Sequence, residues 1–196
     1  MKLLGVCGSP SAPSKTLTAL QVSLGRVRSV RSDVDVDLLD LRATDMRFSD
    51  GRDPSLYEGD TRRAIDAVVA ADALVVGTPI YRGSCTGMLK NLFDVLPNDA
   101  LRGKPVGLIA SGGTDHHFLA VEHQLKPLLG FFQAHTLPGA VWANNTHWSG
   151  GELTDDDLRR QLEQLGESVV EFADRVPRGL VGATAPDIPR RSLAES

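Results

Sequence analysis

Five short runs of apolar, largely β-branched residues recur along the chain. Most of the runs are continuous rather than alternating, which is typical of strands that are buried on both faces of a parallel sheet. They lie at residues 3–7, 34–41, 73–78, 106–111 and 137–143. The pattern therefore predicts five β-strands.

Between and after these runs, apolar residues return every three or four positions, as on one face of an amphipathic helix. This spacing is found at residues 17–27, 65–69, 88–96, 119–132 and 158–176. Thr154, with Asp157 three residues later, is predicted to cap the last helix. The alternation of five strands and five helices predicts a doubly wound α/β domain over residues 1–176.

Two segments stand outside this alternation. Residues 42–59 are mostly polar, and loops of this length are usually functional or interfacial. Residues 177–196 carry several prolines and glycines and a basic pair, Arg190 and Arg191. We expect this tail to be disordered or to act as an arm in an oligomer.

Composition narrows the class of protein. The 196 residues are 41% hydrophobic and 23% charged, with a net charge of −4, which is ordinary for a globular domain. Without a basic cluster, nucleic acid and anionic membranes are poor partners. No apolar run reaches the roughly 18 residues that span a bilayer, and the N-terminus lacks a signal-peptide layout, so a cytoplasmic protein is expected.

The cysteines and histidines show no metal-binding pattern. Cys7 and Cys85 are far apart and have no companion at zinc-ligand spacing, and the five histidines form no H-E-x-x-H motif. We therefore predict no metal. Packing is the simpler role for both thiols, and a redox role stays open.

A loop rich in glycine, serine and proline directly follows the first predicted strand. It reads GSPSAPSKT over residues 8–16 and leads into a predicted helix. Backbone N–H groups, hydroxyls, the helix N-terminus and the charge of Lys15 together suit a phosphate group. A simple turn capped by Ser14 is the alternative interpretation of these residues alone.

The spacing of this loop disfavours two common nucleotide-binding motifs. Pro13 and Ser14 precede Lys15, so the glycine that a Walker A motif requires there is missing. Gly5 and Gly8 do not fit G-x-G-x-x-G, which disfavours a dinucleotide held by its pyrophosphate. A terminal phosphate such as that of FMN remains. This ligand suits a flavodoxin-like three-layer sandwich with a five-stranded parallel sheet of order 2-1-3-4-5.

The third and fourth predicted strands end in loops of a similar kind. Residues 77–87 combine Pro79, the aromatic ring of Tyr81, the cation Arg82 and three glycines, which suits a planar ring. Residues 111–117 read SGGTDHH, and backbone amides of such a turn can bind the polar edge of a flavin. The three loops therefore predict a flavin site at the carboxyl edge of the sheet.

Three segments together resemble the NAD(P)H-dependent FMN reductases of the flavodoxin-like superfamily, of the type that accompanies alkanesulfonate and methanesulfonate monooxygenases. They are GSPSAPSKT at residues 8–16, TPIYRGSCTGMLKNLFDVLP at 78–97 and SGGTDHHFLAVEHQLKPLL at 111–129. The resemblance covers about residues 2–175 and is closest to reductases that accompany luciferase-like monooxygenases. It implies FMN, with NADPH or NADH as the hydride donor.

The resemblance also implies which residues form the site. Ser9, Ser14, Lys15 and Thr16 would hold the phosphate, Pro79, Ile80, Tyr81 and Arg82 would line the isoalloxazine, and Gly112, Gly113 and Thr114 would close its polar edge. The family usually has Arg where Lys15 stands, so a point charge here replaces a bidentate group. Arg82 and His116 are the predicted catalytic residues, because they could stabilise the anionic reduced flavin.

A second implication concerns assembly. Relatives carry a one-residue insertion in the helix after the fourth strand, which forms a π-bulge at a tetramer interface, and His123 occupies the matching position. A surface histidine of an ordinary helix is the alternative. A homo-oligomer, dimer or tetramer, is expected.

The activity implied is hydride transfer from nicotinamide C4 to flavin N5, after which reduced FMN leaves for a flavin-dependent monooxygenase. Two alternatives remain open. One is a reductase of the quinone, azo or chromate type that keeps its FMN bound, and the other is a flavodoxin-like electron carrier.

Overall fold

A twisted parallel sheet forms the centre of the computed structural model, which describes residues 1–177 and 179–183. Its strands are β1 (Lys2–Cys7), β2 (Asp35–Asp40), β3 (Ala73–Pro79), β4 (Pro105–Ser111), β5 (His135–Thr136) and β6 (Val141–Ala143). The order is β2-β1-β3-β4-β5, and β6 also pairs with β4 in parallel. The predicted order 2-1-3-4-5 and the α/β class are confirmed.

The fifth strand differs from the prediction because it is split into two pieces. β5 pairs with the start of β4 and β6 with its end, and residues 137–140 between them carry no strand. Pro138 has no N–H to donate to a ladder, and Gly139 has φ 75°, in the left-handed region that a strand does not use. These two residues therefore interrupt the single strand expected over residues 137–143.

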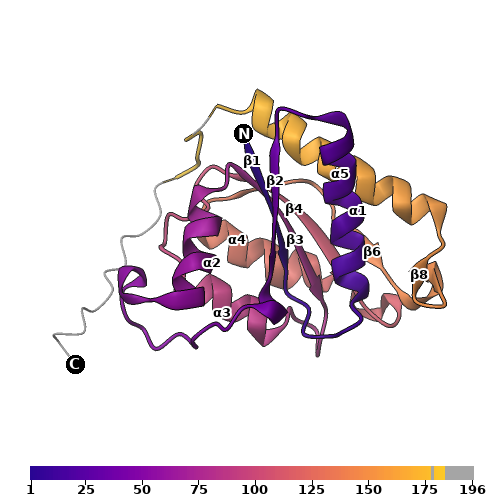
Figure 1. Cartoon of the computed structure of the whole chain (residues 1–196), viewed down its shortest axis with the longest axis horizontal. Helices are drawn as coiled ribbons and strands as arrows, with labels where there is room; N and C mark the ends of the chain where they lie inside the picture. Colours follow the sequence, from indigo (N-terminus) through magenta and orange to yellow (C-terminus); the bar gives the residue numbers. More distant parts are fainter. Residues whose placement is uncertain (178, 184–196) are drawn as a thin grey trace.

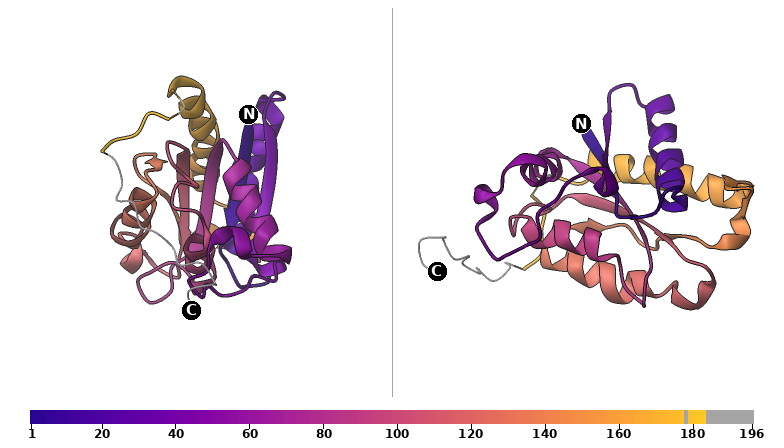
Figure 2. Two further views of the ribbon diagram at one scale, coloured as in Figure 1. Left: turned by 90° about the vertical axis from the view of Figure 1, so that its left-hand side faces the viewer. Right: turned by 60° about the horizontal axis from the view of Figure 1, so that its bottom comes forward.

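Helices cover both faces of the sheet, as Figures 1 and 2 show. α1 (Lys15–Val30) and α5 (Asp156–Arg175) pack together on one face. α2 (Gly59–Ala70), α3 (Gly87–Val95) and α4 (Lys126–Phe131) cover the other. Each face buries its own apolar cluster, so the central strands β1, β3 and β4 are enclosed as their continuous apolar runs predicted.

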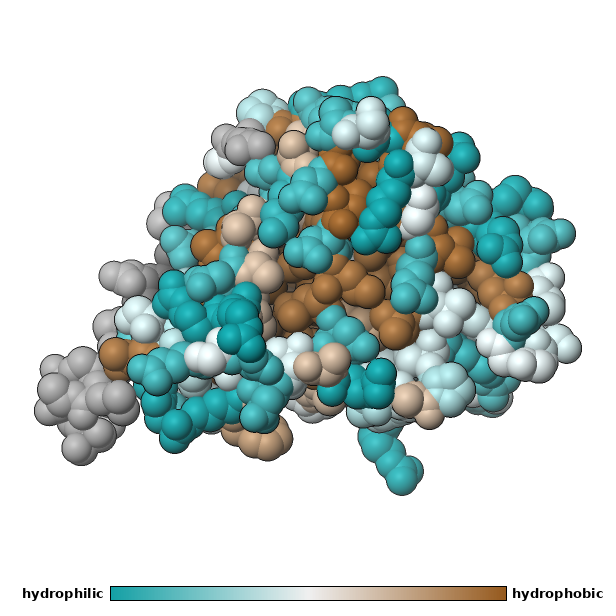
Figure 3. Space-filling view, in the orientation of Figure 1, coloured by the Kyte–Doolittle hydropathy of each residue, from teal (hydrophilic) through white to brown (hydrophobic). Residues whose placement is uncertain are grey.

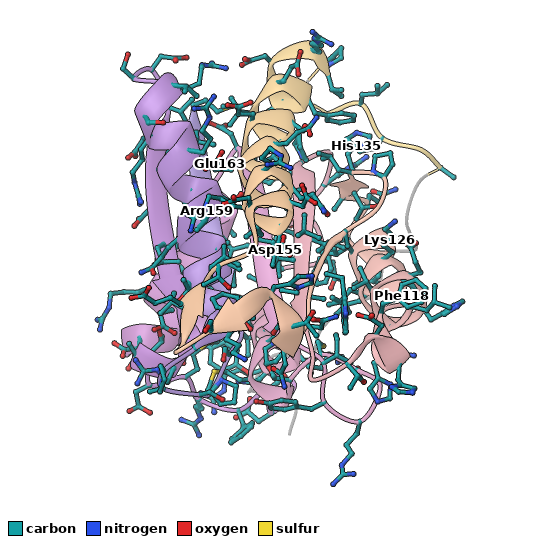
Figure 4. The ribbon with its side chains drawn as sticks, turned by 90° about the vertical axis from the view of Figure 1, so that its right-hand side faces the viewer. Phe118, Lys126, His135, Asp155, Arg159 and Glu163 are labelled. Carbon is teal, nitrogen blue, oxygen red and sulfur yellow. The ribbon has the colours of Figure 1, made fainter. Side chains whose placement is uncertain are left out.

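The last helix begins one residue later than predicted. Asp155, not Thr154, is its N-cap, and the Asp155 Oδ1 atom accepts a hydrogen bond from the Leu158 N–H at 2.7 Å. Figure 4 shows Asp155 at the start of α5 and Arg159 one turn along it. A carboxylate at this position also suits the positive end of the helix dipole.

The helix predicted over residues 119–132 is irregular. A 3₁₀ turn at Asp115–His117 is followed by a π-helical turn at Val121–Leu125 and then by α4. Pro127 lies in the first turn of α4 and has no N–H to donate to the carbonyl four residues earlier, that of His123. The π-helical turn contains His123 and ends at Leu125, directly before α4 begins at Lys126.

The described part of the C-terminal tail lies against the amino end of β5. The Leu180 carbonyl accepts a hydrogen bond from His135 Nε2, which Figure 4 labels, and the Ala183 carbonyl accepts one from Gln133 Nε2. Arg178 and residues 184–196 of the expected tail lie outside the described residues.

The surface in Figure 3 is a mixture of polar and apolar side chains, with an apolar area in the middle of the face. Val36 and Leu38 of the edge strand β2 are half-buried and alternate with exposed Asp35 and Asp37. Among the helices of the described chain, none has the length and apolar character to cross a membrane.

The contact between α1 and α5 depends on Gly166. A Cβ added there would lie 2.5 Å from the Ser23 carbonyl oxygen, so the two helices would have to separate. We expect Gly166→Ala to lower the free energy of unfolding by about 2 kcal/mol, measured by urea denaturation. Gly25→Ala is the control, because no atom lies within 4 Å of its Cβ position, and it should leave stability equal or higher. Equal urea midpoints for wild type and Gly166→Ala would show that the contact adapts.

Candidate functional site

The loop between β1 and α1 begins at Gly8, whose backbone is hydrogen-bonded to Gly77 and Thr86. The Gly8 N–H donates to the Gly77 carbonyl at 2.8 Å, and the Gly8 carbonyl accepts from Thr86 Oγ1 at 2.6 Å. A Cβ on Gly8 would lie 2.7 Å from the Leu89 Cβ, so the close approach requires glycine. The start of the loop is therefore fixed against both β3 and α3.

The end of the same loop presents the start of α1. Ser14 is the N-cap, and its Oγ accepts from the Leu17 N–H at 3.1 Å. The buried hydroxyls of Thr16 and Ser111 lie 2.7 Å apart and join α1 to the end of β4. The first turn of α1 contains no acidic residue, so the positive end of the helix is not neutralised locally.

Lys15 supplies the cation of this loop. Its Nζ donates to Asn145 Oδ1 at 2.9 Å and lies 5.8 Å from the centre of the Trp148 ring. Asn145 lies just after β6, so the segment at the carboxyl end of this strand also contributes a side chain to the site.

The loop after β3 turns back on itself. Tyr81 and Ser84 exchange backbone hydrogen bonds, and the turn between them places Arg82 at φ 55° and Gly83 at φ 80°. The Ile80 N–H donates to the Ser111 carbonyl at 2.8 Å. The half-exposed Tyr81 hydroxyl lies 3.3 Å from Ser11 Oγ and so links this loop to the one after β1.

The loop after β4 is tied to β6. The Gly112 N–H donates to the Ala143 carbonyl at 3.0 Å, and a Cβ on Gly112 would lie 2.8 Å from the Trp142 ring. Asp115 Oδ1 accepts from Trp142 Nε1 at 2.9 Å and from Asn144 Nδ2 at 2.7 Å. This carboxylate therefore anchors the Gly-Gly-Thr turn to β6 and to the residue that follows it.

These loops enclose one cavity of about 430 Å³ at the carboxyl edge of the sheet, the lower edge in Figure 1. Nine of the predicted cofactor-binding residues line it: Ser9, Ser14, Lys15, Thr16, Pro79, Ile80, Tyr81, Gly112 and Gly113. Arg82, Thr114 and His116 lie outside this lining. Arg82 is exposed at the tip of its turn, and Thr114 Oγ1 lies 2.7 Å from His116 Nδ1.

Five residues outside the predicted cofactor-binding set also line the cavity: Ser11, Pro13, Ser111, Ala143 and Asn145. The first three lie within or beside motifs already identified. Ala143 is the last residue of the fifth predicted strand and Asn145 lies two residues beyond it, and this strand also had to end at the carboxyl edge. That rule of parallel sheets was the signal that could have found them.

The cysteines near the site are poor candidates for thiol chemistry. Cys7 is fully buried at the end of β1, and burial is the largest of the causes that raise the pKa of its thiol. Burial likewise raises the pKa of Cys85. Both therefore stay in the neutral thiol form at neutral pH, which favours the packing role.

Comparisons with known proteins identify a family for this chain. Residues 1–149 match the family described as NADPH-dependent FMN reductase. An NAD(P)H-dependent FAD/FMN reductase of Geobacillus thermodenitrificans is 43% identical over 173 residues, which cover 88% of this chain and 93% of that protein. The NADH-dependent FMN reductase SfnF of Pseudomonas putida is 34% identical over 172 residues, covering 88% of this chain and 92% of the relative.

A solved structure supports the same fold. The apo form of the NADH:FMN oxidoreductase EMOB has 29% sequence identity and a TM-score of 0.74, over 90% of this chain and 90% of that chain.

Proposed function

The chain belongs to the NADPH-dependent FMN reductase family and is an NAD(P)H:FMN oxidoreductase, and from this premise we propose that it supplies reduced FMN to a partner flavin-dependent monooxygenase. The observation that carries the proposal is the cavity at the carboxyl edge of the sheet. It joins a cation and hydroxyls to a glycine-rich turn and an aromatic ring.

The residues of this cavity fit FMN. Its 430 Å³ lies within the roughly 300–1,000 Å³ of small-molecule sites. Ser9, Ser14, Lys15 and Thr16 would hold the phosphate at the N-terminus of α1. Pro79, Ile80 and Tyr81 would face the isoalloxazine, and the turn at Gly112 and Gly113 would bind its polar edge.

When bound, the nicotinamide and flavin supply the chemistry, a hydride passed from C4 of one ring to N5 of the other. The protein side chains orient the rings and stabilise charge, and no residue of the cavity is required as a general base. Tyr81 is 47% exposed at the cavity. We infer that the bound flavin is accessible from solvent, as release to a second enzyme requires.

Oxidation of NADPH and NADH, followed at 340 nm with and without added FMN, tests the proposal. We expect the rate to depend strongly on free FMN, and FAD deserves the same test because a relative is named for both flavins. A rate that ignores added FMN but responds to quinone would instead indicate a reductase with bound flavin. No oxidation under any flavin supplement would indicate an electron carrier.

Arg82 is proposed to stabilise the negative charge of the reduced ring from the tip of the Tyr81 turn. Replacing it with alanine should lower kcat with FMN about 10-fold, because a cation near the developing charge is lost. Arg82→Lys keeps the charge and should retain most of the activity. Unchanged kcat in Arg82→Ala would remove this role, and His116, proposed for the same role, would be replaced next.

We also propose a homo-oligomer that uses the face around the π-helical turn. Phe118, Leu119 and Phe131 are 52%, 48% and 44% exposed. Figure 4 shows Phe118 on the same side of the molecule as Lys126 of α4. Light scattering of the purified chain measures the assembly, and a monomeric mass at micromolar concentration would contradict it.

A further inference from the structure

The ammonium group of Lys15 is held in place by the segment that follows β6. Asn145 Oδ1 accepts one of its hydrogens at 2.9 Å, and the Trp148 ring lies 5.8 Å from Nζ. An ammonium has three donors, so two remain for a ligand. Lysine side chains are otherwise costly to order, because they lose much rotamer freedom.

The backbone that carries Asn145 is itself fixed. Buried Asn144 caps the 3₁₀ turn at Asn145–His147: its Oδ1 accepts from the Thr146 N–H at 2.8 Å. Its Nδ2 donates to Asp115 at 2.7 Å, on the loop after β4. Asn145 is therefore presented from a rigid turn that is joined to the rest of the site.

Trp148 supports the cation from a second direction. It is 9% exposed and pairs with Leu153 in the β7–β8 hairpin (Trp148–Ser149 and Glu152–Leu153). Its indole N–H has no hydrogen-bond partner among the described residues, so packing rather than a hydrogen bond holds the ring. A buried aromatic ring near an ammonium attracts it through the ring quadrupole.

The partners of Lys15 leave its charge intact. An amide oxygen and an aromatic ring are both neutral, and within the described part of the chain no carboxylate forms an ion pair with Lys15. Other lysines of the chain, such as Lys90 and Lys126, are instead paired with Asp94 and Glu122. The Lys15 cation is thus both oriented and available to an anion.

We propose that Asn145 is a positioning residue for the 5′-phosphate of the flavin, acting through Lys15, with Trp148 as its support. The inference rests on the proposed flavin site. It explains how a flexible lysine can hold a phosphate: the neighbouring residues restrict the ammonium, whereas the donors of an arginine are fixed by the shape of its planar guanidinium.

Binding of FMN and of riboflavin, which lacks the phosphate, separates this role from general shaping of the cavity. Quenching of flavin fluorescence gives the Kd of both ligands for the full chain. We expect Asn145→Ala to weaken FMN binding about 10-fold and to leave riboflavin binding unchanged. Asn145→Asp should weaken FMN further, because its carboxylate neutralises Lys15 and repels the phosphate.

A double-mutant cycle shows whether Asn145 acts through Lys15. In a Lys15→Ala background, Asn145→Ala should cause no additional loss of FMN affinity. Ser149→Ala, in the same exposed segment, is the matched control and should bind FMN as the wild type does.

Three results would overturn the inference: unchanged FMN affinity in Asn145→Ala, an equal loss for riboflavin, or additive losses in the cycle. Wild-type protein that binds neither flavin would overturn the proposed function as well, which distinguishes the two failures.

Discussion

Gly112→Ala should lower kcat/KM for FMN about 100-fold. The added Cβ would lie 2.8 Å from the Trp142 ring, a distance that such atoms do not tolerate. The indole ring cannot rotate away without loss of the hydrogen bond that its Nε1 donates to Asp115 Oδ1. We expect the turn at residues 112–114 to move instead, which displaces the amides proposed to bind the flavin edge. Steady-state kinetics with varied FMN measure the loss.

The neighbouring Gly113, the distant Gly130 and one rescue variant make this prediction specific. A Cβ on Gly113 would meet only Asn145 Nδ2 at 3.8 Å, so Gly113→Ala should cost much less than Gly112→Ala. Gly130→Ala, on α4 with no atom near, should behave as the wild type. Gly112→Ala combined with Trp142→Leu removes the collision and should regain part of the activity. A double variant as inactive as Gly112→Ala would show that the collision is not the cause.

The second large effect concerns charge. Lys15→Met should raise the KM for FMN about 30-fold, because it removes a charged hydrogen-bond donor from the proposed phosphate site while keeping a side chain of similar size. With riboflavin as the acceptor, the KM should not change, since no phosphate is present. Initial rates of NADPH oxidation at varied flavin concentration give both values.

Two control variants separate loss of the Lys15 charge from a general effect of replacing a lysine. Lys90→Met removes a lysine that is paired with Asp94 on α3, outside the cavity, and should leave the KM for FMN unchanged. Lys15→Arg keeps the charge and should bind FMN far better than Lys15→Met. If Lys15→Met used FMN as well as the wild type does, Lys15 would have no part in phosphate binding.

The central strands were predictable because β1, β3 and β4 are almost wholly buried and their apolar runs are continuous. β3 and β4 are buried at every position, and both lie within one residue of their predicted bounds. The fifth strand was not predictable in this way. Its apolar residues continue through Pro138 and Gly139, and hydrophobic periodicity cannot register a missing N–H or a left-handed φ.

Residues in loops with a recognisable motif could be assigned to the cavity from the sequence, whereas residues in loops without a motif could not. Pro79 and Gly112 directly follow the predicted strands 73–78 and 106–111, so the shared carboxyl edge brings them to one cavity. Asn145 lies in a segment with no motif, and its contact with Lys15 spans 130 residues of sequence. Arg82 lies at the tip of its turn, next to the lining residue Tyr81 but outside the lining itself, and its sequence motif could not predict that position.

The split fifth strand also bears on solubility. An unbroken edge strand offers a row of free backbone groups on which a second molecule can add a strand and begin to aggregate. Here one edge of the sheet is interrupted at residues 137–140, and the other, β2, carries exposed Asp35 and Asp37. Neither border suits strand addition, so the chain is expected to resist fibril formation at high concentration even though most of its sheet is strongly apolar.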